Sequence, residues 1–269
     1  MPELPEVETI RRQLCSAGVE GRVIEKIQIG WPRTVEPLTP AAFSKQVKGR
    51  QIIRLDRHGK WLIFCLDAKE NLLVHLRMTG GFYLTQGTLK KGPHDCAVLQ
   101  LSGGLNLHFR DPRKFGRFRL AAVPEGLGPD ALTVTKQEFF QALDGKDKAL
   151  KALLLDQSFL AGVGNIYADE ALFEALLDPR RKSGSLHDGE RLALWKAVRK
   201  VIEAGVRNKG TSLGSGQGNY VDLNGEAGGH REKVKVYGRA GQLCVVCGQP
   251  LHKIQIAQRT TVFCPHCQK

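Results

Sequence analysis

Residues 61–78 read Trp-Leu-Ile-Phe-Cys-Leu-Asp-Ala-Lys-Glu-Asn-Leu-Leu-Val-His-Leu-Arg-Met, two apolar runs separated by a short polar break. Both runs, Trp61–Leu66 and Leu72–Met78, are typical of β-strands. Further runs of the same kind lie on either side, punctuated by Gly, Asp and Asn: Val23–Ile29, Gln51–Leu55, Ala97–Leu101, Leu105–Phe109 and Phe115–Leu120. Together these runs predict an antiparallel β-sandwich.

Helical patterns flank this region. Three apolar residues after Pro5 recur at helical spacing and predict an N-terminal helix: Val7, Ile10 and Leu14. From about Gly126 the apolar period becomes helical again. One helix is expected over Asn165–Leu177, stopped by Asp178-Pro179, and another along the stripe Leu192, Trp195, Val198 and Ile202.

These patterns predict an α+β fold of several domains. Residues 1–125 are expected to form the β-sandwich with its N-terminal helix, and residues 126–229 a helical domain. The end of that domain, 208–229, holds seven glycines and few large apolar groups, as expected for a mobile loop. Residues 230–269 are expected to form a small zinc-finger hairpin. A chain of 269 residues is long enough for two modest domains and such an appendage.

The charge balance points to a polyanionic partner. Forty Lys and Arg residues stand against 27 Asp and Glu residues, which gives a net charge of +13. DNA is the natural candidate because each phosphate neutralised by Lys or Arg releases bound counterions. Anionic lipid is the rival, but no apolar run approaches membrane-spanning length. The first residues lack the basic-then-apolar layout of a signal peptide, so we expect a cytoplasmic, nucleoid-associated protein.

Four of the seven cysteines form two closely spaced pairs, Cys244-Val-Val-Cys247 and Cys264-Pro-His-Cys267. Each pair presents two thiolates from a tight turn, and the four together complete a tetrahedral zinc shell with no position for water. We therefore predict one structural Zn²⁺ bound by Cys244, Cys247, Cys264 and Cys267, at the base of a hairpin formed by 253–263. A redox dithiol or two disulfides are the disfavoured alternatives, and His266 is an alternative ligand.

Five stretches of the chain carry a family resemblance. They are Met1-Pro-Glu-Leu-Pro-Glu-Val-Glu-Thr9, Arg57-His-Gly-Lys60, His75-Leu-Arg-Met78, Asp111-Pro-Arg-Lys-Phe-Gly116 and Leu160-Ala-Gly-Val-Gly-Asn-Ile-Tyr167. With the four-cysteine motif and the basic charge, they make the chain resemble the bacterial formamidopyrimidine-DNA glycosylase family along its whole length. The resemblance implies a monomeric glycosylase and AP lyase that excises oxidised purines (8-oxoguanine, formamidopyrimidines) from duplex DNA in base excision repair. It also implies a helix-two-turn-helix segment over 160–167 and no obligate protein partner.

The N-terminal motif suits covalent chemistry on a sugar. Removal of Met1 leaves Pro2 with a free secondary amine, and an α-amino group titrates at about pH 7.7–8.0 in model compounds, so a usable fraction is nucleophilic. The resemblance implies that Pro2 attacks C1′, expels the base and leaves a Schiff base that permits β- and then δ-elimination. Glu3 would move protons at the sugar, with Glu6 as a second acidic group. A simple charge at the start of the helix is the alternative interpretation of Glu6. A merely rigid terminus is the alternative interpretation of Pro2.

Two cations complete the implied catalytic set. Lys60 would contact DNA and act as an acid in β-elimination. Arg259, in the hairpin, would bind the lesion-flanking phosphate and assist δ-elimination, since a guanidinium suits bidentate phosphate contact. A surface charge between two strands is the alternative for Lys60.

The remaining implied residues grip DNA. An extruded base leaves a hole in the stack, which the family fills with three side chains that map to Met78, Arg113 and Phe115. Met and Phe act as apolar wedges, and Arg hydrogen-bonds the orphaned cytosine. Asn165, at the start of its helix, would clamp a phosphate. Further DNA contacts are implied for His94, Lys146 and Lys151. From the residues alone, Met78 and Phe115 are core residues and both lysines are solvated.

Two places depart from the family pattern. Position 79 is Thr, where the family varies and sometimes carries an acid that touches the lesion, and Thr211–Gly229, which folds over the extruded base in the family, does not align. The nearest rival function is an endonuclease VIII-type glycosylase for oxidised pyrimidines, and the presence of both Arg113 and Phe115 favours the purine enzyme. A non-catalytic zinc-finger DNA-binding protein is the rival from another class, and it would have no use for Pro2 or Lys60.

Overall fold

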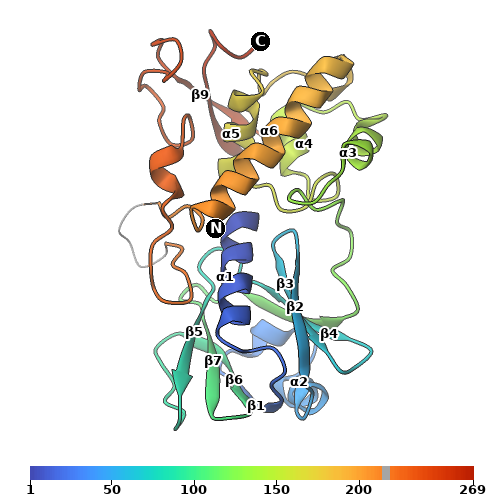
Figure 1. The fold of residues 1–269 in the computed structure, drawn as a ribbon, viewed down its shortest axis with the longest axis vertical. Helices are drawn as coiled ribbons and strands as arrows, with labels where there is room; N and C mark the ends of the chain where they lie inside the picture. The colour runs from blue at the N-terminus through green and yellow to red at the C-terminus, as the bar shows by residue number, and fades with distance from the viewer. Residues whose placement is uncertain (214–218) are drawn as a thin grey trace. The chain divides into compact units, whose positions relative to one another are not determined.

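The computed structural model describes residues 1–213 and 219–269, which divide into two compact units (Figure 1). Unit 1 contains Met1–Glu125 and Asn208–Gly229, and unit 2 contains Gly126–Arg207 and His230–Lys269. These boundaries differ from the expected domains in two places. The glycine-rich segment 208–229 groups with the sandwich rather than with the helices, and the cysteine hairpin groups with the helices rather than standing alone.

Unit 1 is an antiparallel β-sandwich, as predicted. One sheet has the strand order β1 (Ile24–Ile29), β6 (Asp95–Leu101), β7 (Leu105–Arg110) and β5 (Gly81–Gln86). The other has the order β2 (Ile52–His58), β3 (Trp61–Leu66), β4 (Asn71–His75) and β8 (Arg117–Ala121). Three helical elements accompany the sheets: α1 (Leu4–Ser16), η1 (Pro32–Val35) and α2 (Pro40–Val47).

Four phenylalanines fill the centre of the sandwich core: Phe64, Phe82, Phe109 and Phe118. Their rings meet at centroid distances of 4.9 to 6.5 Å with tilted or edge-on geometry, which suits the charge distribution of aromatic rings. Burial of each ring contributes on the order of 1.5–3 kcal/mol to stability. Val7, Ile10 and Leu14 of α1 join the same core, which confirms the amphipathic N-terminal helix.

Two predicted strands are shorter than expected, each at the end that contains a candidate DNA-binding residue. The run Leu72–Met78 ends as a strand at His75, and the run Phe115–Leu120 begins as one at Arg117. The physical reason lies in the backbone, because Arg77 and Lys114 have φ values of +58° and +60°, which no strand accommodates. Met78 and Phe115 therefore lie in turns and not in strands.

Unit 2 combines helices with a hairpin. Its helical elements are α3 (Lys136–Leu143), α4 (Leu150–Leu155), α5 (Asn165–Glu174), η2 (Ser183–Ser185), α6 (Asp188–Arg207) and η3 (His230–Lys233), and its hairpin consists of β9 (His252–Ile256) and β10 (Arg259–Phe263). The expected helix over 165–177 ends early, with Leu176 at a φ of +58° just beyond it. The helical domain and the cysteine hairpin are thus both present.

Acidic side chains of α5 hold the C-terminal segment. Asp169 accepts a hydrogen bond from the backbone N–H of Val262 in β10 at 3.0 Å. Glu170 accepts three more, at 2.8 to 2.9 Å, from the backbone of 235–237. Both carboxylates are buried, so these bonds offset a desolvation cost that would otherwise be large. The hairpin is therefore built onto α5, which explains its place in unit 2.

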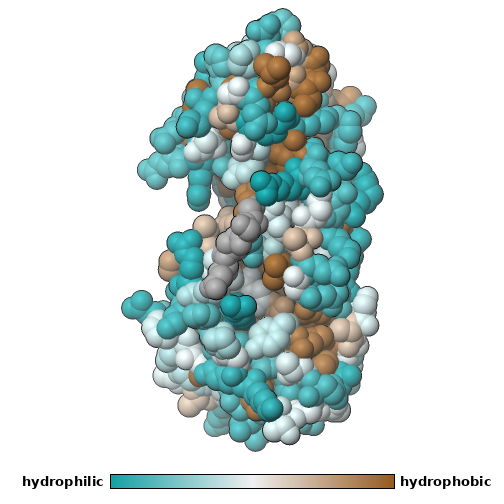
Figure 2. All heavy atoms as spheres, turned by 90° about the vertical axis from the view of Figure 1, so that its left-hand side faces the viewer, coloured by the Kyte–Doolittle hydropathy of each residue, from teal (hydrophilic) through white to brown (hydrophobic). Residues whose placement is uncertain are grey.

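The described helices include none that is long and apolar enough to cross a membrane. The face of the molecule in Figure 2 is mostly hydrophilic, with scattered hydrophobic groups. Charged residues make up 25% of the sequence, an ordinary proportion for a globular protein.

Candidate active site and zinc centre

The N-terminus is fixed by a capping box at the start of α1. The backbone N–H of Glu3 donates to Glu6 Oε2 at 2.7 Å, and the Glu3 side chain accepts from the backbone of Glu6. Glu3 and Glu6 are 2% and 1% exposed, and Pro2 is buried beside them, whereas Met1 is 44% exposed. The nucleophile predicted from the sequence thus lies at a rigid position, next to the two carboxyl groups that were predicted with it.

Glu6 also joins the start of α1 to the segment that follows α6. Its second carboxylate oxygen, Oε1, accepts a hydrogen bond from the backbone N–H of Thr211 at 2.7 Å. Gly210 must be glycine here, because its φ is +82° and a Cβ would lie 2.7 Å from Glu6 Cγ. The sequence suggested only a flexible linker at this point, and a glycine that faces a distant glutamate leaves no local signal.

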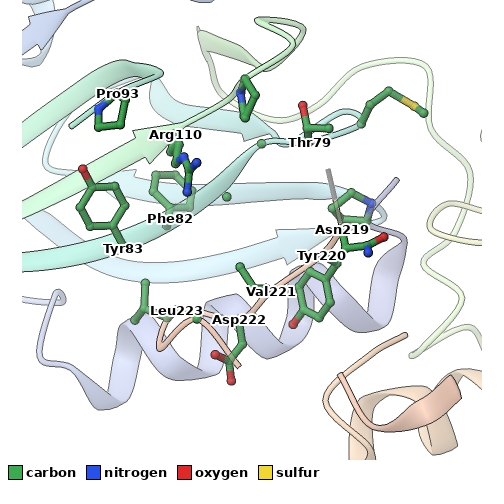
Figure 3. A pocket seen from close by; sticks show the side chains of 16 residues that line it. Thr79, Phe82, Tyr83, Pro93, Arg110, Asn219, Tyr220, Val221, Asp222 and Leu223 are labelled. Carbon is green, nitrogen blue, oxygen red and sulfur yellow. The ribbon is translucent and has the colours of Figure 1, made fainter. Parts of the chain in front are cut away.

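A cavity of about 380 Å³ opens beside Pro2 within unit 1. In Figure 3, Thr79, Phe82, Tyr83 and Arg110 lie on the side of the sheet that contains β5, across the cavity from Asn219, Tyr220, Val221, Asp222 and Leu223. The lining is mostly apolar with a few polar groups, as is typical of sites that bind a small flat molecule. The cavity has room for a nucleobase beside the chain terminus.

The segment that borders this cavity is anchored on α1. The amide of Gln13 donates to Asp222 Oδ2 at 2.6 Å and accepts from the backbone N–H of Leu223 at 3.0 Å. Leu223 is 7% exposed and packs into the sandwich core. The described parts of the expected mobile loop 208–229 therefore pack on unit 1. Residues 214–218 of that loop lie outside the described residues.

Lys60 lies in the tight turn between β2 and β3. The strands pair up to His58 and Trp61, so that Gly59 and Lys60 alone form the turn, with Gly59 at a φ of +56°. Lys60 is 6% exposed. A lysine that is buried to this degree is not the solvated surface charge that the alternative interpretation required.

An ionic cluster fixes this turn to α1. The buried carboxylate of Glu8 pairs with Arg57 at 3.1 Å, and with Arg11 and Arg12 at 2.8 Å each. Burial alone would raise the pKa of Glu8, but the hydrogen bonds from Arg11 and Arg12 and the charge of Arg57 outweigh it and lower the pKa to about 2. Arg57 also donates to the carbonyl of Gly59 at 3.0 Å, next to Lys60.

His75 stays neutral in this region. Burial, followed by the charges of Arg77 and Lys60, lowers the pKa of His75 to about 3. Its Nδ1 accepts a hydrogen bond from the backbone N–H of Arg77 at 3.0 Å, which helps to hold the turn before Met78. The charges of Arg77, Lys60 and Arg119 act on His75 and make this edge of unit 1 electropositive.

The predicted void-filling residues lie in two turns of unit 1. Phe115 is 45% exposed, although it follows an apolar pattern, and the guanidinium of Arg113 stacks over its ring at 4.8 Å. Met78 is half-buried and borders the cavity. His94 is exposed at a φ of +68°, and its carbonyl accepts from the backbone N–H of Asp111 at 3.0 Å.

In unit 2, Asn165 opens α5 directly after Gly164. Its amide donates to the carbonyl of Thr260 at 3.1 Å, which links the helix start to the hairpin. Arg259 is exposed next to Thr260, after a two-residue turn with both φ values positive. Two of the predicted phosphate-binding residues, Asn165 and Arg259, are thus held on one small framework within this unit.

Lys151 is not available to DNA. It is fully buried, and its ammonium pairs with Asp169 at 2.6 Å and donates to the carbonyl of Asn165 at 2.8 Å. Burial raises the pKa of Asp169 to about 6, against the opposing effect of Lys151. The expected DNA contact is replaced by a structural pair between α4 and α5. Lys146, by contrast, is exposed.

The four cysteines of the hairpin come together as predicted. Their sulfur atoms all lie within 4.8 Å of one another, with Cys244 to Cys267 at 3.9 Å and Cys247 to Cys264 at 3.5 Å. A tetrahedron with Zn–S bonds of about 2.3 Å has edges of roughly 3.8 Å. Backbone N–H groups of Val246 and Cys267 donate to Cys244 Sγ and Cys264 Sγ at 3.5 and 3.4 Å. The four cysteines therefore bind one structural zinc ion.

A helix-capped sandwich with a cavity at its N-terminus, together with helices and a zinc hairpin, defines the class of zinc-containing DNA glycosylases. Residues 1–118 match the formamidopyrimidine-DNA glycosylase N-terminal domain, residues 126–216 its H2TH domain, and residues 241–269 the zinc finger found in FPG and IleRS. The chain belongs to the formamidopyrimidine-DNA glycosylase family.

Relatives and solved structures agree with this assignment. The formamidopyrimidine-DNA glycosylases of Carboxydothermus hydrogenoformans and Herpetosiphon aurantiacus are 42% and 41% identical over the full length of both chains. The crystal structure of the MutM (FPG) protein from Thermus thermophilus is 40% identical, with a TM-score of 0.86 over 99% of this chain and 98% of that one. A Lactococcus lactis Fpg in complex with abasic-site DNA is 31% identical, with a TM-score of 0.87 over 99% of each chain.

Proposed function

We propose that the protein is a bifunctional DNA glycosylase and AP lyase that excises 8-oxoguanine and formamidopyrimidines from duplex DNA. The observation that carries this proposal is Pro2, buried beside Glu3 and Glu6 at the edge of a cavity of about 380 Å³. Membership of the family supports it, as do related Lactococcus lactis complexes with DNA that contains N7-benzyl-Fapy-dG or an abasic site. Action on chromosomal DNA would place the protein in the cytoplasm, at the nucleoid.

In the proposed reaction, the Pro2 nitrogen forms a bond to C1′ while the glycosidic bond breaks and its electron pair leaves with the base. The Pro2 nitrogen loses its proton, and the C1′–O4′ bond of the sugar then breaks to give the Schiff base. A proton must reach the departing base and O4′, and Glu3 is the adjacent acid. The resulting Schiff base acidifies C2′, so that loss of a proton there expels the 3′ phosphate. A second elimination expels the 5′ phosphate. Lys60 would supply acid to the first elimination, and Arg259 would bind a phosphate in the second.

DNA binding would use both units. Met78, Arg113 and Phe115 would fill the space left by the extruded nucleotide, with Arg113 directed at the opposite base. His94, Lys146 and Asn165 would contact the backbone, in keeping with the net charge of +13. Lys151 is fully buried and is not part of this proposed set.

An endonuclease VIII-type enzyme would share this machinery but prefer oxidised pyrimidines. We expect the protein to release 8-oxoguanine from duplex DNA faster than thymine glycol, because the presence of both Arg113 and Phe115 favours the purine enzyme. The measurement is strand cleavage of two duplexes that differ only in the lesion. Faster cleavage at thymine glycol would favour the rival enzyme. Binding without cleavage of either duplex would favour a non-catalytic DNA-binding protein.

Replacement of Arg113 by Ala should flatten the preference for cytosine opposite the lesion. A base contact of this kind contributes about 1–3 kcal/mol to discrimination. The measurement is kcat/KM on 8-oxoguanine opposite cytosine and opposite adenine. Arg207→Ala, at an exposed position at the end of α6, serves as the matched control and should leave the ratio unchanged. An unaltered ratio in Arg113→Ala would mean that Arg113 does not read the base.

A further inference from the structure

Two turns of unit 1 run side by side from one sheet of the sandwich to the other. The first leaves β4 at His75 and enters β5 at Gly81, and the second leaves β7 at Arg110 and enters β8 at Arg117. His75 pairs with Arg117, and Gly81 pairs with Arg110, so both ends of the two turns are neighbours. The first turn carries Met78 and the second carries Arg113 and Phe115.

One buried carboxylate joins these turns. Asp111 is fully buried; its Oδ1 accepts the hydroxyl of Thr79 and the backbone N–H of Arg113 (3.2 Å), and its Oδ2 accepts the backbone N–H of Gly116 at 2.7 Å. A buried carboxylate is costly unless donors surround it. Two of these donors belong to the second turn itself, and the Thr79 hydroxyl is the one that reaches across from the first turn.

Both turns pack closely against one aromatic ring, that of Phe109, and each does so through a glycine. A Cβ at Gly80 would lie 2.8 Å from Cζ of Phe109, and a Cβ at Gly116 would lie 2.3 Å from the same atom. Phe109 is fully buried and belongs to the sandwich core. The two turns therefore rest on a shared surface, and a shift of one turn on the ring displaces packing under the other.

The second turn is also held from its outer side. Arg117 donates to the carbonyls of Phe115 and Gly116 at 3.0 and 2.9 Å. The ammonium of Lys114 lies over the ring of Trp31, 4.3 Å from its centroid. With these contacts and Asp111 in place, the main chain that carries the stacked pair of Arg113 and Phe115 has little freedom.

We propose that Thr79 is a positioning residue for recognition of the base opposite the lesion. Its hydroxyl, donated to Asp111, fixes the Met78 turn to the Arg113–Phe115 turn, so that all three side chains meet DNA in one arrangement. The proposal rests on the proposed function, in which Arg113 reads that base. A bidentate guanidinium contact tolerates only small displacements, so its selectivity depends on how firmly the turn is held.

The test compares Thr79→Val, which removes the hydroxyl and keeps the shape, with Thr79→Ser, which keeps the hydroxyl. Thr88→Val, in an exposed loop, is the matched control. The readout is the ratio of kcat/KM on 8-oxoguanine opposite cytosine to that opposite adenine. We expect this ratio to fall about tenfold in Thr79→Val, the effect of one hydrogen bond to a charged group. It should stay within about twofold of the wild type in Thr79→Ser and Thr88→Val.

Thr79 also lines the cavity, so its side chain could contact the lesion instead (Figure 3). If its side chain reads the lesion instead, Thr79→Val will change the preference between 8-oxoguanine and formamidopyrimidine and leave the opposite-base ratio intact, which overturns the proposal. The double variant Thr79→Val with Arg113→Ala should have the same opposite-base ratio as Arg113→Ala alone, because both substitutions act through one contact. Additive losses contradict the proposal.

The roles proposed for Arg113 and for Thr79 are tested separately. The proposed role of Arg113 is contradicted if the wild type has the same kcat/KM opposite cytosine and adenine. It is also contradicted if Arg113→Ala keeps the wild-type ratio of the two. A normal response of Arg113→Ala with no response of Thr79→Val would count against Thr79 alone. Thermal melting of each variant shows whether it is folded. If Thr79→Val is not folded, Thr79→Ala, which also removes the hydroxyl, takes its place, and a wild-type opposite-base ratio in Thr79→Ala contradicts the proposal.

Discussion

A form of the protein that retains Met1 should bind abasic-site DNA and leave it uncut. With Met1 attached, the Pro2 nitrogen is an amide whose lone pair is delocalised, so that it cannot attack C1′. The proposed phosphate contacts do not need that nitrogen, so binding should persist. Removal of Met1 frees a buried secondary amine at the edge of the cavity. The expected loss of strand cleavage is essentially complete, which makes this the largest effect of any change at the site.

Borohydride reduction measures this directly, because it converts a Schiff base into a stable cross-link. We expect mass spectrometry of the cross-linked peptide to place the DNA on Pro2. Pro2→Gly should weaken the trapping, since a primary amine replaces the rigid secondary one. Lys60→Ala, the comparison variant, should slow cleavage and still be trapped. A cross-link on Lys60, or full activity with Met1 retained, would overturn the assignment, because a buried lysine can also form a Schiff base.

Local patterns account for most of what the sequence could predict. The strands of the sandwich are short apolar runs between turn residues, and the zinc ligands lie in two pairs of fixed spacing. β5 was missed although Phe82, Tyr83 and Thr85 favour a strand, because the run is short and begins at Gly81 after another glycine. α2 was missed because only two of its side chains, Phe43 and Val47, are buried.

Residues whose environment is set by distant partners could not be predicted. Lys151 has the sequence context of a surface lysine, and only the fold brings Asp169, 18 residues away, to its ammonium. Phe115 fits a strand pattern, yet the hydrogen bonds that Asp111 accepts hold it in an exposed turn. Glu6 was predicted as an acid near the sugar, but its contact with Thr211, 205 residues away, is a product of the fold.

Loss of the zinc site should disable DNA binding while unit 1 stays folded. In Cys264→Ser, three thiolates remain, and structural zinc contributes on the order of 10–16 kcal/mol to the folding of small zinc domains. Cys244, Cys264, Val262 and Phe173 share one small core, so its collapse reaches α5. Arg259 and the Asn165 contact to Thr260 would both be misplaced. We expect DNA affinity to fall on the order of 100-fold, from two contacts of about 1.5 kcal/mol each.

The control is Cys15→Ser, which replaces a cysteine of unit 1 outside the zinc cluster and should keep both zinc and affinity. Metal analysis should give one zinc ion per chain in the wild type and in this control, and none in Cys264→Ser. Far-ultraviolet circular dichroism should still report the sandwich in all three, because its core contains no residue of the hairpin. Zinc lost with DNA binding intact would show that the hairpin does not hold the phosphate-binding residues. The proposed contacts of Asn165 and Arg259 would then not depend on the zinc-bound hairpin, which the hydrogen bond from Asn165 to the carbonyl of Thr260 in β10 argues against.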